Sequence, residues 1–288
     1  MPDASPSRSR LVAIGAGVVF LVVLVATLLA LSHEEPTLRA AASVPTTTTS
    51  ASSSTTTPLA PPPSSDGSSS DSAPSTTAAP TGLQALPSRT SEVATVRDGV
   101  ADVPVHDTVD GSSVSQTISA TGDYGQPQVF LVAGREGDRL EVLLPVRPNG
   151  ARGWIDASLV DVATHDYQIQ VSLSGFRMMV QKGSEVVIDT PIGVGTQDTP
   201  TVGGDFYTWV LIDPTNSGYG SYAYGLSGFS TLEQFAGGDG RMGIHGTEDE
   251  SSIGRNVSHG CVRVPDDVVV RMVEEVGLPL GVPVTVLA

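Results

Sequence analysis

The sequence has only one cysteine, Cys261, among its 288 residues. A single cysteine cannot form an intramolecular disulfide, so its thiol is either an apolar filler of the core or a free group kept for its reactivity. No cysteine closely follows the apolar run near the N-terminus. This second absence excludes a lipidated N-terminal cysteine as a means of membrane attachment.

Basic residues are also scarce. The chain has 15 Lys and Arg against 31 Asp and Glu, and its formal net charge is −16. No basic patch and no Lys/Arg-rich run is found outside the positions just before residue 11. We therefore expect neither a nucleic acid nor an anionic membrane surface as a partner, although the charge identifies no substrate.

Charged residues are absent from positions 11–31, which form 21 consecutive uncharged and mostly apolar residues. As a helix this run would be roughly 31 Å long, about the thickness of the hydrocarbon layer of a bilayer. Arg8 and Arg10 precede it, and Glu34-Glu35 follow it. The positive-inside rule then predicts a cytoplasmic tail at residues 1–10, a transmembrane anchor at 11–31, and all later residues outside the cytoplasm.

A cleaved signal peptide is the alternative interpretation of this segment. The alanines at 40–42 suit a signal peptidase, but they lie about ten residues beyond the apolar run. The run is also longer than the usual apolar region of a signal peptide, which has about 7–15 residues. We therefore prefer an uncleaved anchor.

Residues 32–88 lack the composition of a folded domain. Between positions 43 and 80, 28 of 38 residues are Ser, Thr or Pro, and none is basic or aromatic. Such a segment cannot bury enough apolar surface to offset the entropy of ordering it, so the sequence predicts a disordered linker. About 55 flexible residues would span roughly 40 Å, which lets a tethered domain act at a distance from the membrane.

Short alternating apolar runs, broken by Gly, Pro and Asp, predict a small all-β module over residues 90–163. The runs lie at 93–96, 128–132 and 140–144. The stretch 138–144, followed by Gly153-Trp154-Ile155, resembles the end of an SH3-like barrel. In bacterial envelope proteins that resemblance would imply wall binding or a spacer, and a packing module without a ligand is the alternative.

A second β-rich domain is predicted over residues 167–288. Alternating runs at 167–173 and 177–181 flank Ser174-Gly175, which is a hairpin signal. The irregular stretch 213–240, rich in Gly, Ser, Tyr and Phe, is expected to be a long functional loop. Further strands are expected at 185–190, 206–212 and 282–287.

One helix is predicted near the C-terminus. Pro265 suits the first helical position, and Gly277 suits the position just after the last turn. Between them, Val269, Met272, Val273 and Val276 follow the spacing of one apolar helix face.

The surroundings of Cys261 favour reactivity. The cysteine lies in the run Ser258-His259-Gly260-Cys261-Val262-Arg263, sixteen positions after His245. A thiol nucleophile needs a base and N–H donors for an oxyanion, and the histidines and glycines here offer both. His245 ends one apolar stretch and Cys261 begins another, so two strand ends would bring imidazole and sulfur together. Because His precedes Cys, papain-like enzymes are excluded, and the residues indicate a cysteine acyl-transfer enzyme.

The same segment resembles a known family. The blocks Ile244-His245-Gly246-Thr247, Ser251-Ser252-Ile253-Gly254 and Ser258–Arg263 closely resemble the catalytic signature of the L,D-transpeptidases of bacterial peptidoglycan. Thr199-Pro200-Thr201 resembles the Thr-Pro-Thr-Gly turn of that family, although Val202 replaces the glycine. The resemblance covers roughly residues 167–288.

This resemblance implies a mainly β fold, namely a YkuD-like β-sandwich with one C-terminal helix. The SH3-like module, the disordered linker and the transmembrane helix would precede it. It implies no cofactor and no metal. The catalytic domain would then face the cell wall from the outer side of the membrane.

By motif position, Cys261 would be the nucleophile and His245 its general base. The carbonyl of Gly246 would orient the imidazole, and His259, Gly260 and the Cys261 N–H would line the oxyanion hole. A free cysteine has a pKa of about 8.5, so we expect the adjacent imidazole to hold the pair as thiolate and imidazolium.

Six further residues are predicted to lie at the substrate. Arg263 would meet a substrate carboxylate or only brace the loop, and Ser258 lies within the motif. Tyr222 and Tyr224, with Tyr219 and Phe229, would form a lid or groove wall over the substrate, simple packing being the alternative.

The resemblance implies a reaction on peptidoglycan stem peptides. The thiolate would attack the carbonyl of the third residue, a diamino acid, in a tetrapeptide stem and expel the terminal D-alanine. The side-chain amine of a neighbouring stem would then take the thioester, which links two third-position residues without ATP. Acylation by carbapenems is implied as well.

Other interpretations remain at this stage. Taken singly, a cysteine or histidine is usually a core residue. A metal site from His245, His259 and Cys261 would lack the usual ligand spacing and a clear fourth ligand. The chain could also be a wall-binding protein with a silent site. The same chemistry with water, a free D-amino acid or a protein amine as acceptor would give a carboxypeptidase, an exchange enzyme or a protein-anchoring enzyme.

Overall fold

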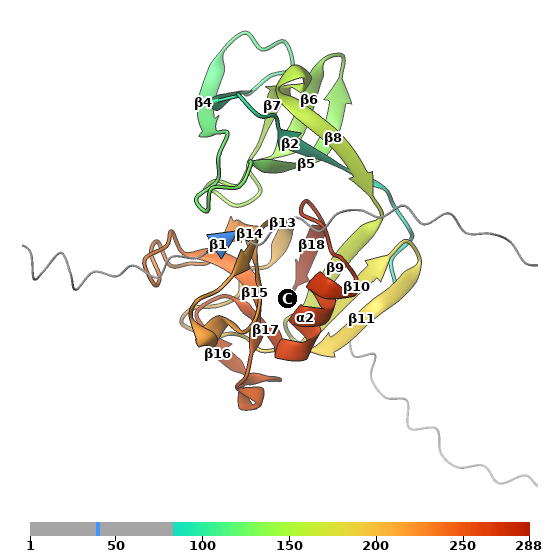
Figure 1. Cartoon of the computed structure of the whole chain (residues 1–288), viewed down its shortest axis with the longest axis vertical. Helices are drawn as coiled ribbons and strands as arrows, with labels where there is room; N and C mark the ends of the chain where they lie inside the picture. The colour runs from blue at the N-terminus through green and yellow to red at the C-terminus, as the bar shows by residue number, and fades with distance from the viewer. Residues whose placement is uncertain (1–38, 41–82) are drawn as a thin grey trace, which may run out of the picture. The chain divides into compact units, whose positions relative to one another are not determined.

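The computed structural model of the chain describes residues 39–40 and 83–288. In this part the fold is mainly β, with one α-helix close to the C-terminus (Figure 1). The predicted tail, the anchor and nearly all of the predicted linker lie outside the described residues. Both β-sheet modules belong to one compact unit of the chain.

The first module is a seven-stranded antiparallel sheet with the order β4-β3-β7-β6-β5-β2-β8. Alternate residues of its strands, such as Ala94, Phe130, Leu140 and Ile155, are fully buried and form one core. The three strand segments expected in this region overlap β2, β5 and β6, whereas the likeness to an SH3 barrel stays a prediction. Its strands are β2 (Ser91–Val96), β3 (Asp102–His106), β4 (Val114–Ser119), β5 (Val129–Glu136), β6 (Arg139–Leu143), β7 (Arg152–Asp156) and β8 (Val160–His165).

The second module contains a large mixed sheet with the order β11-β10-β9-β18-β13-β14-β15-β17. Two of its pairs, β18 with β9 and β15 with β17, are parallel. Its strands are β9 (Tyr167–Ser172), β10 (Arg177–Lys182), β11 (Glu185–Pro191), β13 (Gly204–Asp213), β14 (Ala223–Phe229), β15 (Arg241–Thr247), β17 (Val262–Pro265) and β18 (Pro283–Leu287).

Two short pieces complete the strand pairing. The segment β12 (Val194–Gly195) pairs in parallel with β16 (Asn256–Ser258), which immediately precedes the cysteine loop. The segment β1 (Arg39–Ala40) pairs with the end of β13 through its backbone. Three 3-10 turns lie at Ala157–Leu159, Ser217–Tyr219 and Glu250–Ser252.

The single described helix, α2 (Asp266–Glu274), follows β17 directly and buries Val269, Met272 and Val273 against the second sheet (Figure 1). Pro265 is the N-cap residue rather than the first helical residue, so the helix begins one position later than expected. Gly277 has φ +63° and ends the segment by a conformation that suits glycine.

The expectation of one long loop over 213–240 is wrong, because β14 lies within this stretch and pairs with both β13 and β15. Six of its seven residues are buried, so the strand shows no alternation of apolar and polar residues. Its glycines also hide the pattern: a Cβ on Gly228 would collide with the ring of Phe206. The remaining connection to β15, residues 230–240, is a true loop.

The two modules share a small apolar cluster. Leu143 of the first sheet packs with Tyr207, Trp209 and Ile212 of β13. The buried hydroxyl of Tyr207 donates a hydrogen bond to the carbonyl of Val129 at 3.0 Å. The modules therefore contact each other through buried side chains and not only through the chain that connects them.

Candidate active site

The parallel pairing of β15 and β17 brings His245 and Cys261 together. Ile244 pairs with Val262, His245 pairs with Arg263, and Cys261 comes immediately before β17. Continuing this register places Cys261 beside Gly243, and alternation then puts His245 and Cys261 on the same face of the sheet. Strand spacing and rise put their Cα atoms roughly 8 Å apart, within reach of an imidazole and a thiol. His245 lies two residues before the end of its strand.

The imidazole of His245 is held in one orientation. Its Nδ1 lies 2.7 Å from the carbonyl oxygen of Gly246, and the side chain is only 4% exposed. A carbonyl can only accept a hydrogen bond, so Nδ1 carries the proton and Nε2 keeps its lone pair. The contact is the one that the family resemblance implies for Gly246, and it leaves Nε2 free to accept a proton.

Burial shifts the pKa values of both reactive groups. Burial, with a smaller effect from the positive charge of Arg263, lowers the pKa of His245 to about 4. Burial also raises the pKa of the Cys261 thiol, against the opposing effects of the Gly243 backbone and Arg263. Burial thus disfavours the charged form of each group taken singly. The thiolate–imidazolium pair expected from the sequence stays a prediction, with general-base activation of a neutral thiol as the alternative that burial favours.

The cysteine loop is braced by Ser258. Its hydroxyl donates to the carbonyl of Cys261 at 2.6 Å and accepts the N–H of Gly260 at 3.2 Å. Gly260 has φ +119°, a backbone conformation that glycine adopts readily. The Gly260 N–H is thus engaged by Ser258, and the oxyanion hole expected from His259, Gly260 and the Cys261 N–H stays a prediction. Ser258 is 2% exposed and shapes the loop, so a direct substrate contact is not its role here.

The side chain of His259 points to a different part of the site from His245. It is exposed, and its ring stacks on Phe235 of the 230–240 loop, with 4.5 Å between ring centroids and 25° between planes. The stacking occupies one face of the imidazole. His259 thus forms part of the wall of the site at the cysteine loop.

Arg263 pairs with His245 in the sheet and lies two residues after Cys261, so strand alternation puts its side chain on the same face as both reactive groups. Its backbone N–H donates to the carbonyl of Gly193 at 2.8 Å, and its carbonyl accepts the Gly193 N–H at 2.9 Å. The buried Nε of its guanidinium has no hydrogen-bond partner among the described residues. A cation in this position can receive an anionic group of a ligand.

The two predicted substrate tyrosines face away from the reactive pair. Tyr224 is fully buried and donates its hydroxyl to the carbonyl of Leu278 at 2.9 Å, so its assignment to substrate binding is wrong and it packs the core. Tyr222 donates to Glu274 of α2 at 3.0 Å. Ala223 of β14 pairs with His245, so strand alternation turns the side chains of Tyr222 and Tyr224 to the opposite face of the sheet.

Tyr219 is the aromatic residue that contacts the reactive histidine. Its ring lies 4.8 Å from the ring of His245, at 58°. Burial first, and then the neighbouring Cys261, raise the pKa of its hydroxyl. The carboxylate of Asp266 anchors the adjacent turn, accepting from the N–H and the hydroxyl of Ser221 at 2.7 and 2.6 Å. In the sequence, only the tyrosine-rich composition of this stretch pointed to Tyr219.

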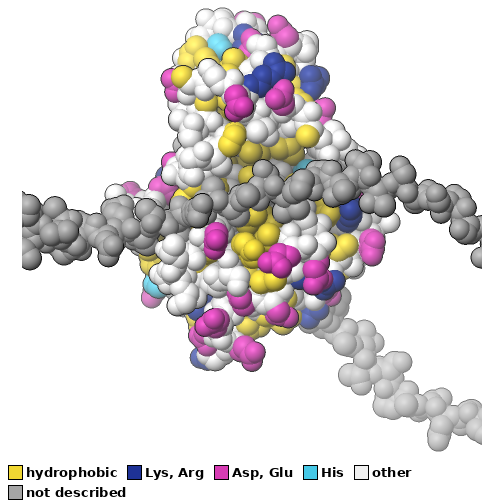
Figure 2. Space-filling model, viewed as in Figure 1, with side chains coloured by type: hydrophobic (Ala, Val, Ile, Leu, Met, Phe, Trp, Pro, Cys, Tyr) yellow, Lys and Arg dark blue, Asp and Glu magenta, His cyan; other side chains and the backbone are white. Residues whose placement is uncertain are grey.

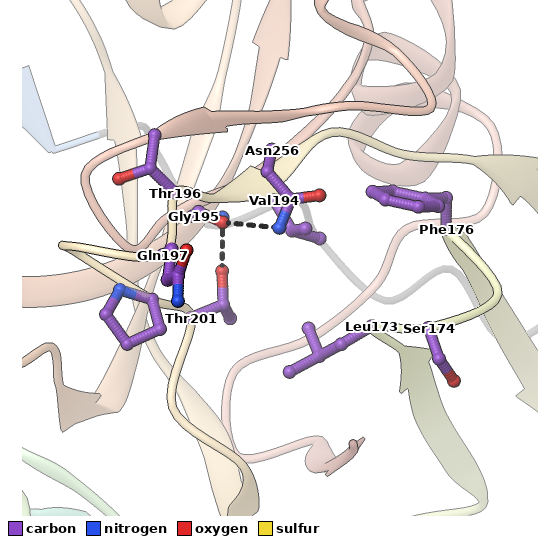
Figure 3. A pocket seen from close by; sticks show the side chains of 10 residues that line it. Leu173, Ser174, Phe176, Val194, Gly195, Thr196, Gln197, Thr201 and Asn256 are labelled. Carbon is purple, nitrogen blue, oxygen red and sulfur yellow. Dashed lines mark hydrogen bonds between the residues drawn. The ribbon is translucent and has the colours of Figure 1, made fainter.

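A cavity of about 530 Å³ lies beside the strand that leads to the cysteine loop (Figure 3). Leu173 and Phe176 lie on one side of it and Thr196, Gln197 and Thr201 on the other. Two of the lining residues are joined by a hydrogen bond from the Asn256 amide to the carbonyl of Gly195 at 3.1 Å. Neither Cys261 nor His245 lines this cavity, so it is separate from the reactive pair.

Comparison with known proteins identifies the family. Residues 166–286 match the model of the YkuD L,D-transpeptidase catalytic domain. The chain is 32% identical over 130 residues to the putative L,D-transpeptidase YkuD of Bacillus subtilis, covering 44% of this chain and 70% of that protein. The chain belongs to the L,D-transpeptidase family. The YkuD protein of Bacillus licheniformis is 36% identical over 102 residues, which are 35% of this chain and 54% of that protein.

Solved structures of L,D-transpeptidases also match. The NMR structure of the catalytic domain from E. faecium is 27% identical, with a TM-score of 0.33, and covers 42% of this chain and 97% of that chain. A crystal structure of Mycobacterium tuberculosis L,D-transpeptidase 1 is 20% identical, with a TM-score of 0.30, and covers 48% of this chain and 78% of that one. The assignment to the family rests on the sequence matches and not on these superpositions.

Two further expectations concern a metal site and a membrane-spanning helix. No group of three or more His, Cys, Asp or Glu side chains in the described part of the chain is arranged to hold a metal ion. Within the same residues, no helix is long and apolar enough to span a bilayer. The predicted anchor at 11–31 lies outside them. Figure 2 shows Asp and Glu side chains scattered over one face, with Lys and Arg in small groups among them.

Proposed function

We propose that this L,D-transpeptidase forms peptidoglycan cross-links through a thioester on Cys261. The observation that carries the proposal is the placement of His245: its Nδ1 is locked on the Gly246 carbonyl, and β15 pairs with the strand that begins after Cys261. Cys261 is the only thiol in the chain. An imidazole whose Nε2 keeps its lone pair, on the same face of the sheet as the thiol, is an arrangement suited to general-base activation.

In the first half-reaction, His245 Nε2 takes the thiol proton while sulfur bonds to the carbonyl carbon of the third stem residue, a diamino acid. The N–H groups of Cys261 and His259 stabilise the oxyanion that forms. The intermediate then collapses, the C–N bond to the terminal D-alanine breaks, and the imidazolium gives its proton to the leaving amine. A thioester on Cys261 remains.

In the second half-reaction, the side-chain amine of a neighbouring stem attacks the thioester. His245 removes a proton from that amine, the C–S bond breaks, and the sulfur takes the proton back. The free energy of the original peptide bond is conserved in the thioester, so no nucleotide is needed. Arg263, which pairs with His245 in the sheet, would receive an anionic group of the stem peptide through its guanidinium.

The location of the reaction is part of the proposal. The apolar run 11–31 would anchor the chain in the cell membrane, with the catalytic domain outside the cytoplasm facing the cell wall. The linker would give the domain its reach, and the 90–163 module would act as an SH3-like wall contact or spacer. The basis for these statements is the sequence pattern described above.

The mass of the intact protein tests the chemistry. After incubation with a carbapenem or a tetrapeptide stem, the wild type should gain one adduct, and with stems alone it should release D-alanine. Cys261→Ala should gain no adduct and keep the thermal unfolding temperature of the wild type. An adduct on Cys261→Ala would refute the role of the thiol. Adding an acceptor stem, water alone or a free D-amino acid distinguishes cross-linking from hydrolysis and exchange.

A further inference from the structure

The first module contacts the catalytic module through the guanidinium of Arg147, which precedes β7. Its Nη1 donates to the carbonyl of Ser230 at 3.2 Å, and its Nη2 donates to the carbonyls of Leu232 and Asp239 at 2.7 and 3.1 Å. Ser230 and Leu232 lie at the start of the 230–240 loop, and Asp239 lies near its end. One side chain therefore fastens both ends of this loop.

Asn149 fixes the residue from which the loop departs. Its Nδ2 donates to the carbonyl of Phe229 at 2.8 Å, and its Oδ1 accepts the Phe229 N–H at the same distance. The amide thus pairs with Phe229 as a neighbouring strand would. The guanidinium groups of Arg147 and Arg241 also lie over the Phe229 ring, 4.4 and 4.3 Å from its centroid. These contacts connect two modules that are separate in the sequence.

The 230–240 loop in turn contacts the two residues before the cysteine. Phe235 stacks on His259, and Ser230 packs against Gly260 so closely that a Cβ on that glycine would lie 2.7 Å from the Ser230 Cβ. The hydroxyl of Ser230 donates to the carbonyl of Gly240, which keeps the loop closed at its base. A displacement of this loop would therefore move the backbone that carries the Cys261 and His259 N–H groups.

We propose that Arg147 and Asn149 are positioning residues for the acylation step, so that the first module holds one wall of the active site. The proposal rests on the function proposed above. Most residues of the loop are exposed, and its internal backbone hydrogen bonds are the pair of Phe235 with Gly238, at 2.9 and 3.0 Å, and the bond from the Ser230 N–H to the Gly240 carbonyl at 2.9 Å. A loop with so few contacts of its own gains its order from the groups that hold its ends. The first module then contributes to catalysis by positioning the 230–240 loop.

The test uses the full-length protein and the variants Arg147→Ala and Asn149→Ala. The matched control is Arg152→Ala, which removes an exposed arginine of the same module that contacts Glu141 at 3.7 Å. Two rates are measured: acylation of Cys261 by a carbapenem, and alkylation of Cys261 by iodoacetamide. Acylation needs the oxyanion donors in place, whereas alkylation needs only an accessible thiol.

We expect acylation to slow roughly tenfold or more in Arg147→Ala and Asn149→Ala, because small displacements of catalytic groups have large kinetic effects. Alkylation should stay within about twofold of the wild type, and Arg152→Ala should change neither rate. Arg147→Lys should recover part of the acylation rate, since an ammonium also donates to carbonyls. Asn149→Asp should not recover it, because a carboxylate cannot donate to the Phe229 carbonyl.

Hydrogen exchange gives a readout that does not depend on activity. The amides of residues 230–240 should exchange faster in Arg147→Ala than in the wild type or Arg152→Ala. Unchanged acylation and unchanged exchange in both alanine variants would overturn the proposal. So would equal losses of acylation and alkylation together with a lower unfolding temperature, which would indicate general damage. If the wild type itself is not acylated, the proposed function fails, and exchange alone then decides whether the loop is held in this way.

Discussion

At the residue scale, the most informative group is the buried imidazole of His245. Its pKa is lowered to about 4, chiefly by burial, so the basic form persists well below neutral pH. If this imidazole is the general base, the rate of carbapenem acylation should stay level from pH 7 to about pH 5 and fall only near pH 4. In His245→Ala the rate should instead increase with pH, as hydroxide generates the thiolate. An acid limb near pH 6.5 in the wild type would contradict the lowered pKa.

The same shift predicts a pH dependence of stability. The unfolded chain binds a proton on this histidine at about pH 6.5, while the folded chain does so only near pH 4. Between these values the unfolded state holds more protons, so the free energy of unfolding decreases as the pH falls through this window. The loss attributable to His245 should approach about 3 kcal/mol at pH 4. Urea unfolding at pH 7 and at pH 4.5 measures this loss. Between the two pH values, the free energy of unfolding should decrease less for His245→Gln than for the wild type.

Gly246 is a second residue whose role follows from its surroundings. A Cβ at this position would collide with a carboxylate oxygen of Asp266 and lie 2.8 Å from Val269, at the start of α2. Gly246→Ala should therefore destabilise the fold by about 1–3 kcal/mol and slow acylation, because the Gly246 carbonyl that holds His245 must move. Gly203→Ala is the control, since its Cβ would meet only the Val286 carbonyl at 3.4 Å. Equal unfolding temperatures for the two variants would contradict the argument.

At the element scale, the Thr-Pro-Thr turn supports the strand that leads to the cysteine. The buried hydroxyl of Thr201 accepts the Gly195 N–H at 2.9 Å, and that of Thr199 donates to the carbonyl of Ser258 at 3.2 Å. Thr201→Val keeps the shape but leaves a buried N–H unpaired, so it should cost about 1–3 kcal/mol and also slow acylation. Thr285→Val, which loses only an exposed bond to Asp205, should have little effect. Similar urea midpoints for both variants would refute the bracing role.

The helix α2 connects the site to the core in a similar way. Its first residue, Asp266, holds the turn that carries Tyr219, and Tyr222 donates to Glu274 in its last turn. The apolar face of the helix meanwhile packs on the second sheet through Val269 and Met272. One nine-residue element therefore positions an aromatic neighbour of His245 and stabilises the sheet that bears it.

At the scale of the whole molecule, the sequence predicts a catalytic domain tethered outside the membrane. Protease added to intact spheroplasts should cut the Ser/Thr/Pro-rich segment and release a soluble fragment that begins near residue 90. That fragment should retain carbapenem acylation, because both β modules and their contacts remain in it. Detergent-lysed cells are the control for access to the protein. A fragment released only after lysis would place the domain in the cytoplasm and contradict the positive-inside argument.

Much of the fold followed from the sequence because local patterns fixed it. The alternation at 167–173 and 177–181 predicted β9 and β10, and the spacing of Val269, Met272 and Val273 predicted α2. The strand β14 escaped prediction because neighbours bury it on both faces and its glycines conceal the period. The orientation of Tyr224 was missed for the same reason: only the packed sheet determines which tyrosine reaches the site.

The sequence by itself determined the chemistry that is available: one thiol, His245 sixteen residues before it, and the motif that names the family. Only the tertiary structure decided how deeply the reactive groups are buried and which residues hold the loops around them. Burial is a property of the whole fold, and it shifts the pKa of both reactive groups toward their uncharged forms. The hold of Arg147 on the 230–240 loop joins positions more than 80 residues apart, and no local pattern encodes such a contact.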